Sequence, residues 1–300
     1  MKKYGKTRNV RRYKSYGMKI VLTIMAGSIA CLFLMPMVIT VVNSFMTEQE
    51  IQTNYGMIFS EKNGRFISET VNLKLIPDWV SLEQYFTVLM KSPDYLMKLW
   101  NSLFLVVPIV IFQLIVGCLA AYGFANMRGK GIAMIFFGYI VLMLMPYQVT
   151  LVPNYLVAKW MNLIDTNWAI WFPGIFAPFS VYLLTKYMKR IPWEIVEAAE
   201  MDGAGQWQIF YHIVVPVCKG AIASCAILIF IDYWNMVEQP VVMFSNANFH
   251  PLSVFLSKIQ TEDIGIAFAA AVVYMLPVTL IFLYGEDYLI DGIASQGSIK

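Results

Sequence analysis

Four carboxylates lie close together in one polar stretch of the chain, residues 187–218, which we call the acidic segment. They belong to Glu194, Glu197, Glu200 and Asp202. A carboxylate that accepts a charge-assisted hydrogen bond contributes about 1.5–3 kcal/mol. A helix that lies on a membrane surface typically carries Lys and Arg on its polar face instead. The acids therefore favour a docking surface for a partner protein, with an amphipathic surface helix as the alternative.

The residues around these acids predict two short helices joined at a glycine. Pro192 suits the first turn of a helix, because its missing N–H would be unpaired there anyway. Gly203 suits the position just past a helix end, where the backbone is left-handed and a side chain would clash. A second helix is expected over residues 206–214, and Pro216 marks its turn into the next apolar run. One face of the first helix is formed by Ile195, Ala198, Ala199 and Asp202.

Motifs of common catalytic and metal sites are missing from the sequence. The chain has no Gly-x-x-x-x-Gly-Lys-Ser/Thr run to cradle nucleotide phosphates, no His-Glu-x-x-His and no Gly-x-Ser-x-Gly. The two histidines, His212 and His250, are far apart in the sequence. The cysteines fall in or beside apolar runs, which favours small buried residues over disulfides or metal ligands. We therefore expect no catalytic residue, no metal site and no cofactor on this chain.

The composition is that of a membrane protein. Hydrophobic residues make up 59% of the chain and charged residues 14%, whereas soluble domains are about half apolar and a quarter charged. Mean hydropathy is +0.61. A transmembrane helix needs about 20 apolar residues. Runs of this kind occur at residues 20–42, 101–125, 132–158, 168–185, 220–237 and 266–285. The predicted fold class is an all-α polytopic membrane protein with six transmembrane helices.

Basic residues before the first apolar run predict the orientation of the chain. They are Lys2, Lys3, Lys6, Arg8, Arg11, Arg12, Lys14 and Lys19. Positive charge beside a first span holds that side in the cytoplasm, and beside a span this topological role is favoured over nucleic-acid binding. Six spans then place both termini and the acidic segment in the cytoplasm.

The apolar runs divide the chain into five parts. The parts are a basic cytoplasmic tail (1–19), the first transmembrane helix (20–43), an external segment (44–99), a core of five helices that contains the acidic segment (100–285), and a cytoplasmic C-terminal tail (286–300).

The external segment is long enough to carry structure of its own. Asn63-Gly64 is a tight-turn signal, and the flanking residues 57–59 and 66–67 predict two short strands of a β-hairpin within residues 56–75. Ser81, with Gln84 three residues later, predicts the start of a short helix.

The acidic segment resembles a known element. Glu197-Ala198-Ala199, then Gly203, Ile213 and Pro216 at their spacing, is similar to the coupling loop of membrane subunits of bacterial ABC importers. Further stretches resemble the maltose-type carbohydrate permeases, and these are residues 81–85, 100–102, 145–149 and 163–168. Asn162 stands where that family usually has Gly, and Asn tolerates a left-handed backbone.

The resemblance implies a transport assembly around this chain, in the cytoplasmic (inner) membrane of a bacterium. It implies a second permease subunit, two ATPase subunits that bind ATP and Mg²⁺, and an external solute-binding protein. It assigns contact with the ATPase to Glu197, Ala198, Ala199, Asp202, Gly203 and Ala204. A permease for a non-carbohydrate solute is the alternative. An ion-coupled secondary transporter would need inverted repeats and several buried ionisable groups, which the sequence does not offer.

Polar residues within the apolar runs are candidates for a substrate pathway. Asp232 is the clearest case, because an ionisable group inside a span is expensive to bury and is usually functional. Asp and Asn side chains can bind sugar hydroxyls, and aromatic rings can stack on a sugar's apolar face. A structural pair or an aromatic interface belt is the alternative. The candidates are Asn235, Asp232, Trp234, Asn154 and Gln148.

The C-terminal tail resembles the terminal segment that reaches into the ATPase dimer in maltose-type permeases. Its small residues predict an extended strand that fits between two protein surfaces, with contacts from Gly292, Gly297 and Lys300. The alternative is a frayed chain end.

Overall fold

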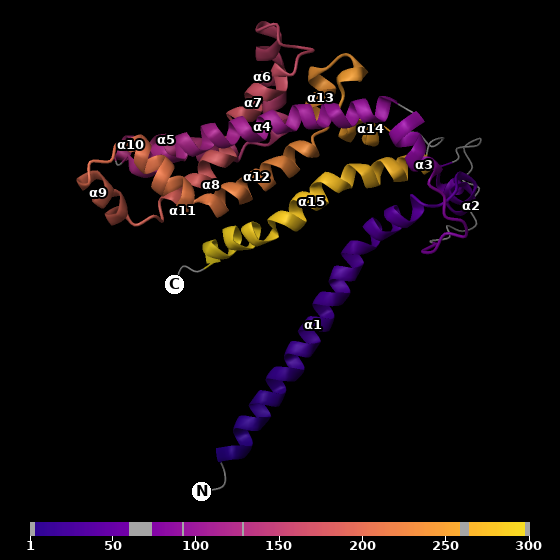
Figure 1. The fold of residues 1–300 in the computed structure, drawn as a ribbon, viewed down its shortest axis with the longest axis horizontal. Coiled ribbons are helices and arrows are strands. Elements are labelled where there is room, and N and C mark those ends of the chain that lie inside the picture. The colour runs from indigo at the N-terminus through magenta and orange to yellow at the C-terminus, as the bar shows by residue number, and fades with distance from the viewer. Residues whose placement is uncertain (1–3, 60–73, 92, 128, 259–263, 298–300) are drawn as a thin grey trace. The chain divides into compact units, whose positions relative to one another are not determined.

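The computed structural model describes residues 4–59, 74–91, 93–127, 129–258 and 264–297, and these ranges contain helices and no strand (Figure 1). The predicted all-α class is confirmed. The chain forms two compact units, which are described separately below. The first comprises Met1–Thr87 with Gln260–Val272, and the second comprises Val88–Ile259 with Val273–Lys300.

The first unit begins with one long helix. The basic tail and the first predicted span are continuous in α1 (Tyr4–Asn43). Two further helices of this unit are α2 (Glu48–Phe59) and α3 (Glu83–Phe86). A small apolar cluster is centred on Met46 and Ile51, both fully buried, with Val42 and Phe268 packed against it.

The predicted β-hairpin is wrong in its first strand. Residues 57–59 are the last turn of α2 rather than a strand. The helix is favoured at its start, where the Thr47 hydroxyl accepts a hydrogen bond from the Glu50 N–H at 3.3 Å, and by the burial of Ile51 on its inner face. The predicted turn at Asn63-Gly64 and the second strand lie outside the described residues.

The short helix after the external segment begins close to its predicted start. The Ser81 hydroxyl accepts a hydrogen bond from the Glu83 N–H at 3.2 Å, and α3 begins at Glu83. Gln84 does not complete a capping box. Its buried amide instead donates to the Met46 carbonyl at 2.6 Å, because that carbonyl needs a partner inside the fold.

The second unit contains most of the helices. A π-helical turn, η1 (Thr87–Lys91), straddles its start. The remaining elements are α4 (Pro93–Asn126), α5 (Lys130–Met143), α6 (Tyr147–Trp160), α7 (Trp168–Ile175), α8 (Pro178–Met188), α9 (Trp193–Met201), α10 (Gln206–Ile209), the π-turn η2 (Phe210–Val214), α11 (Val215–Val217), α12 (Lys219–Trp234), α13 (Glu238–Met243), the 3₁₀ turn η3 (Ala247–Phe249) and α14 (Leu252–Ser257). The last helix, α15 (Ile264–Gly297), begins in the first unit and continues in the second.

Four stretches are long and apolar enough to cross a membrane, and they overlap four of the six predicted spans. They are Met18–Asn43, Asp94–Asn126, Trp168–Met188 and Gly265–Leu289. The other two predicted spans are bent pairs. The axis turns by 99° between α5 and α6 and by 74° between residues 206–217 and α12. The structure therefore has four to six candidate spans. The first break precedes Pro146, whose extended backbone cannot continue a helix.

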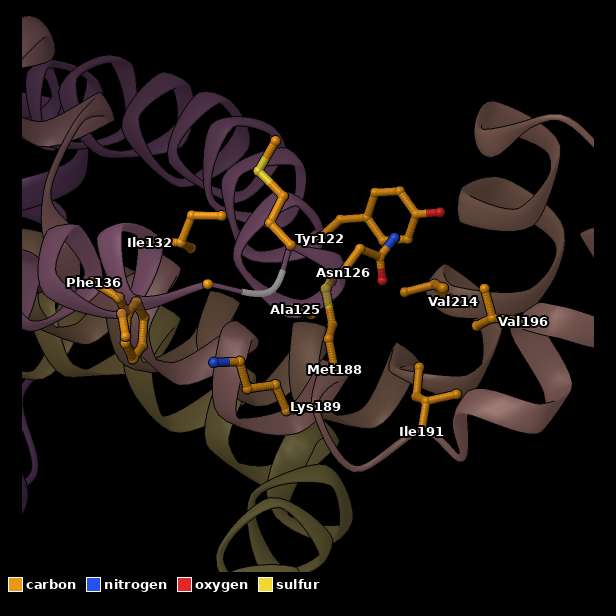
Figure 2. Close-up of a pocket in the computed structure, with 13 residues that line it drawn as sticks. Tyr122, Ala125, Asn126, Ile132, Phe136, Met188, Lys189, Ile191, Val196 and Val214 are labelled. Atoms are coloured by element: carbon orange, nitrogen blue, oxygen red, sulfur yellow. The ribbon is translucent and has the colours of Figure 1, made fainter.

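The ends of α4 and α8 and the start of α5 surround a cavity of about 430 Å³ (Figure 2). We call it the α4–α5 cavity. Tyr122 and Asn126 line it from α4, Phe136 from α5, and Met188 and Lys189 from the end of α8.

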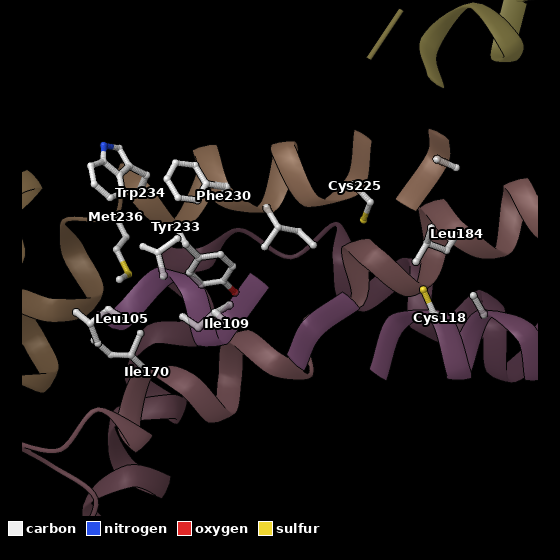
Figure 3. Packing of buried hydrophobic residues seen from close by; sticks show 14 of the residues in the cluster. Leu105, Ile109, Cys118, Ile170, Leu184, Cys225, Phe230, Tyr233, Trp234 and Met236 are labelled. Atoms are coloured by element: carbon white, nitrogen blue, oxygen red, sulfur yellow. The ribbon is translucent and has the colours of Figure 1, made fainter. Parts of the chain in front are cut away.

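The core of the second unit lies where α4 packs against α7, α8 and α12 (Figure 3). Leu105, Ile109, Leu184 and Trp234 are almost completely buried in it. Gly117 permits the close approach of α4 and α8, since a Cβ atom there would lie only 2.6 Å from the Ser180 Oγ atom. The other buried residues of the cluster include Cys118, Cys218 and Cys225, whereas Cys31, which the sequence also predicted to be buried, is exposed on α1.

The C-terminal tail is not extended. Residues 286–297, including Gly292 and Gly297, continue α15 as a helix. The segment contains no proline after Pro277, and an isolated glycine in a helix costs only about 1 kcal/mol relative to Ala. The prediction of an extended strand is therefore wrong for these residues, and Lys300 lies outside the described residues.

Candidate functional sites

The acidic segment folds as two helical pieces joined at Gly203. The first piece, α9, starts directly after Pro192, and Gly203 has a left-handed backbone with φ of 84°. Two hydrogen bonds close this helix end. The Gly203 N–H donates to the Glu200 carbonyl at 3.0 Å, and the Ala204 N–H donates to the Ala199 carbonyl at 2.9 Å. This pattern is a Schellman motif, and it confirms the predicted role of Gly203.

Side-chain hydrogen bonds tie the second piece to its surroundings. The Gln206 amide donates to the Glu200 carboxylate at 2.7 Å and its carbonyl oxygen accepts from the Tyr122 hydroxyl of α4 at 2.7 Å. The side-chain oxygen of Gln208 accepts a hydrogen bond from the Gly205 backbone N–H at 2.9 Å, and this bond caps α10. The predicted single helix over residues 206–214 is instead α10 followed by the π-turn η2. The joint between the two pieces is therefore held by side chains as well as by the backbone.

One side of the acidic segment faces the core. Val196, Ile209, Phe210 and Val214 are buried, and Ala199 packs against them. Ala199 therefore belongs to the inner side and not to the partner-facing side that the sequence predicted. The π-turn contributes to this packing, because it presents Phe210 and Val214 to the same core.

The other side of the acidic segment is exposed. Glu197, Ala198, Asp202 and Gly203 lie on it, and Ala204 is half-buried at its edge. Ile195, which the sequence placed on this helix face, is exposed, and sequence reasoning missed three further exposed apolar residues beside these acids, which are Met201, Trp207 and Tyr211. Met201 is 87% exposed and Trp207 is 65% exposed. The signal was present, because large apolar residues in a polar segment need a protein or lipid partner.

A shallow hollow of about 380 Å³ lies on the exposed side, between the end of α9 and the turn η2. Asp202, Gly203 and Ala204 form one wall, and Gln208 and His212 form the other. Since Gly203 has no side chain and nothing within 4 Å of its missing Cβ atom, the floor of this hollow is open to a side chain from a partner.

A second site lies at the end of α12, where a pocket of about 540 Å³ is lined by polar groups. We call it the α12 pocket. It is lined by Asp232 and Asn235, as the sequence suggested, and also by Tyr147 and Glu238, which sequence reasoning did not select. Gln148 lies beside it, with its amide 3.4 Å from the Glu238 carboxylate oxygens. Hydroxyl, amide and carboxylate groups thus meet at one place, a combination that can bind a polyhydroxylated solute.

Trp234 and Asn154 lie elsewhere. Trp234 is 1% exposed and stacks between Phe230 and Tyr274, with ring centroids 5.2 Å and 5.6 Å away. Its indole N–H donates to the Tyr274 carbonyl at 3.1 Å, so it is a core residue and not part of the pocket wall. Asn154 is half-buried on α6 and does not line the α12 pocket.

Tyr274 of α15 positions the pocket residue Asn235. The Tyr274 hydroxyl bonds both the Trp234 carbonyl at 2.9 Å and the Asn235 side-chain oxygen at 2.7 Å. The Asn235 amide donates to the Ile231 carbonyl at 2.8 Å. Both polar atoms of Asn235 are therefore used within the fold, and Asp232 and Glu238 are the acceptors that a solute would meet. Among the described residues no group of three or more potential metal ligands is present.

A helical chain with several membrane spans, a rigid acidic segment at their ends and a polar pocket among them has the architecture of a membrane transport subunit. Residues 87–293 match the family of binding-protein-dependent transport system inner membrane components. The chain belongs to this family, and it is a multi-pass membrane protein.

Relatives of known activity have similar sequences. The arabinooligosaccharides transport system permease protein AraQ of Halalkalibacterium halodurans is 24% identical over 92% of this chain and 95% of its own length. The osmoprotective compounds uptake permease protein GgtD of Synechocystis is 31% identical over 67% of this chain and 69% of its own. The lactose transport system permease protein LacG of Rhizobium radiobacter is 25% identical over 69% and 76%.

A solved structure has the same fold. A chain of a bacterial ABC transporter that imports the acidic polysaccharide alginate superposes with a TM-score of 0.74 at 21% identity, covering 96% of this chain and 99% of that chain. A chain of a bacterial alginate transporter in complex with a pentasaccharide-bound periplasmic protein gives a TM-score of 0.64 at 15% identity, covering 92% and 96%.

Proposed function

We propose that this chain is the permease subunit of an ATP-driven importer that translocates a sugar or oligosaccharide delivered by an external binding protein. The observation that carries the proposal is the family match over residues 87–293. The arabinooligosaccharide and lactose permeases among its relatives support a carbohydrate. The relative that takes up osmoprotective compounds supports the second candidate, a small polar solute of another class.

The acidic segment would be the docking site for the ATPase. Its shape supports this role, because the Schellman motif fixes the joint at Gly203 and the hydrogen bond from Tyr122 to Gln206 ties the segment to α4. Its exposed acids and exposed apolar side chains offer both charge and apolar area to a partner. Closure of an ATPase dimer against Glu197, Ala198, Asp202 and Gly203 would then tilt the attached helices as a rigid body.

The remaining subunits follow from this role. A second permease would complete the pathway, two ATPase subunits would hold ATP and Mg²⁺, and an external binding protein would supply the solute. Both termini and the acidic segment would lie in the cytoplasm, as the basic residues before Ile20 require. Since α15 is helical to Gly297, any contact of Gly292 and Gly297 with the ATPase would be made by a helix end.

The solute would pass the α12 pocket. Asp232 and Glu238 would accept hydrogen bonds from its hydroxyl groups, and the Tyr147 hydroxyl and the Gln148 amide could donate to it. Trp234 and Tyr274 would hold the wall in place without contacting the solute.

The test is uptake by the complete transporter in proteoliposomes, with binding protein outside and ATP inside. We expect Glu197→Lys to weaken ATPase association and to reduce uptake, because it reverses charge on the docking side. Glu286→Lys, at an exposed glutamate of α15, is the matched control and should transport normally. Normal uptake and normal ATPase association in the Glu197→Lys variant would refute the docking role.

Single-cysteine labelling tests the orientation in a background without the native cysteines. A cysteine at exposed Ala198 should react only with a reagent that reaches the cytoplasm, and one at Gly64 should react from outside. Labelling of the Ala198→Cys variant from outside would overturn the topology.

A further inference from the structure

The α4–α5 cavity lies at the ends of candidate membrane spans. Two candidate spans end beside it, at Asn126 and at Met188. Figure 2 shows Ile132 and Phe136 of α5 on one side of the cavity and Val196 and Val214 of the acidic segment on the other. Since a span ends where the hydrocarbon layer gives way to the headgroups, the cavity opens at headgroup depth.

The walls of the cavity are apolar on the α5 side and basic at the end of α8. Among the described residues that line the cavity, Lys189 is the cation and none is an acid. Its ammonium lies 5.1 Å from the Phe136 ring centroid, a cation–π contact that holds it at the cavity (Figure 2). One turn earlier, Lys186 lies 5.7 Å from the Tyr182 ring centroid.

The positive charge of Lys189 is not compensated within the part of the chain that the structure describes. No ion pair found there involves Lys189, whereas Lys74, for example, pairs with Glu50 and with Asp78. A cation beside an apolar cavity at headgroup depth suits a ligand that has both a negative group and a hydrocarbon chain. Basic pockets between transmembrane helices bind the headgroups of anionic lipids in this way.

We propose that the α4–α5 cavity binds an anionic phospholipid, with its phosphate on the Lys189 ammonium and its acyl chain along Ile132 and Phe136. The Asn126 amide lines the same cavity and is placed to donate to a phosphate or glycerol oxygen. The cavity also touches Val196 and Val214, which are buried on the inner side of the acidic segment. A bound lipid would therefore support this segment from its inner side, a consequence that rests on the proposed docking role, whereas the binding itself does not.

The experiment is native mass spectrometry of the purified complete transporter titrated with phosphatidylglycerol. We expect Lys189→Gln to weaken the tightest-bound lipid by about tenfold, since one charge-assisted hydrogen bond is lost. Lys186→Gln is the matched control. It removes a lysine charge one turn before Lys189, at a residue that does not line the cavity. Equal lipid binding in the unaltered protein and the Lys189→Gln variant would overturn the proposal, as would an equal loss in the Lys186→Gln variant.

A second variant tests the apolar wall independently of charge. Ala133 is an exposed residue that lines the cavity, and Ala133→Trp should fill the space and displace the lipid. Phosphatidylcholine should bind at least about tenfold more weakly than phosphatidylglycerol. Inorganic phosphate and glycerol 3-phosphate at millimolar concentration should not compete. Competition by either would identify a free phosphate compound as the ligand, and equal binding of phosphatidylcholine would exclude recognition of charge.

Discussion

The acidic segment and the α12 pocket are built in different ways. The acidic segment takes its shape from neighbours in the sequence, since the two bonds that close α9 join residues of the same short turn. The α12 pocket is held by residues far apart in the sequence, where Tyr274 bonds Trp234 and Asn235 and Gln148 reaches Glu238. The first site can therefore move as one rigid piece, whereas the second changes shape whenever α15 or α6 shifts against α12.

The comparison predicts that Trp234, beside the α12 pocket, stabilises the fold much more than Trp207 on the surface of the acidic segment does. Trp234→Ala should reduce the free energy of unfolding by about 3–5 kcal/mol, because it leaves a cavity in the core between Phe230 and Tyr274. Trp207→Ala, at an exposed ring that stacks only on its neighbours, should cost about 1 kcal/mol. Thermal unfolding in detergent measures the loss of stability in each variant. Equal losses in the two variants would contradict the prediction that only Trp234 is a core residue.

The next largest effect is expected on the coupling of uptake to ATP hydrolysis and not on the stability of the protein. Gly203→Val places a β-branched residue at φ of 84°, which costs about 1–2 kcal/mol or more and distorts the joint of the acidic segment. We expect uptake to fall by about tenfold while membrane insertion is unchanged. Gly205→Ala is the control, because its φ is −71° and an added Cβ atom would lie 3.9 Å from the nearest heavy atom. If the Gly203→Val variant transported at the normal rate, the joint would not need a left-handed residue.

A smaller effect on uptake is expected from Tyr274 of α15, whose hydroxyl bonds the pocket residue Asn235. Tyr274→Phe removes the hydroxyl that bonds Asn235 and the Trp234 carbonyl, which should cost about 0.5–1.5 kcal/mol. We expect the KM for uptake to change a few-fold with little change in ATP hydrolysis. Tyr284→Phe, at an exposed tyrosine of the same helix, is the control. Identical kinetics for the two variants would show that Asn235 does not need this support.

The smallest effect is a pH dependence that arises outside both regions, at His250 in the loop before α14. Burial lowers the pKa of His250 below its usual value of about 6.5, although its hydrogen bond with the Phe244 carbonyl at 3.2 Å acts in the opposite direction. The folded state then binds the proton less tightly than the unfolded state does. The stabilisation is complete above the unfolded pKa and is lost as the pH falls below it, through the pKa of the folded protein.

Thermal unfolding of the transporter between about pH 7 and pH 5 measures this loss. The His250→Gln variant should show a weaker dependence on pH over the same range. An unchanged dependence would assign the loss of stability to other groups.

The class of fold and the acidic segment could be predicted because both depend on local chemistry. Long apolar runs can only be helices in a membrane, and the spacing of Pro192 and Gly203 encodes a helix start and a helix end. Asn162 is a similar case, since its left-handed backbone with φ of 56° was expected from its side chain. The external hairpin and the extended tail were predicted from weaker signals, and α2 and α15 are helical there instead.

By itself, the sequence determined that this chain is a helical membrane protein with an acidic segment of two helical pieces joined at a glycine, because apolar runs and helix-end signals act over a few residues. Only the tertiary structure decided which polar residues share a pocket. Trp234 is adjacent to Asn235 in the sequence, yet it packs into the core while Asp232 and Asn235 line the α12 pocket with Tyr147 and Glu238. The physical reason is that side-chain burial depends on the packing of α12 against α4 and on the hydrogen bonds that Trp234 and Asn235 make with Tyr274. Neither can be predicted from residues that are neighbours in the sequence.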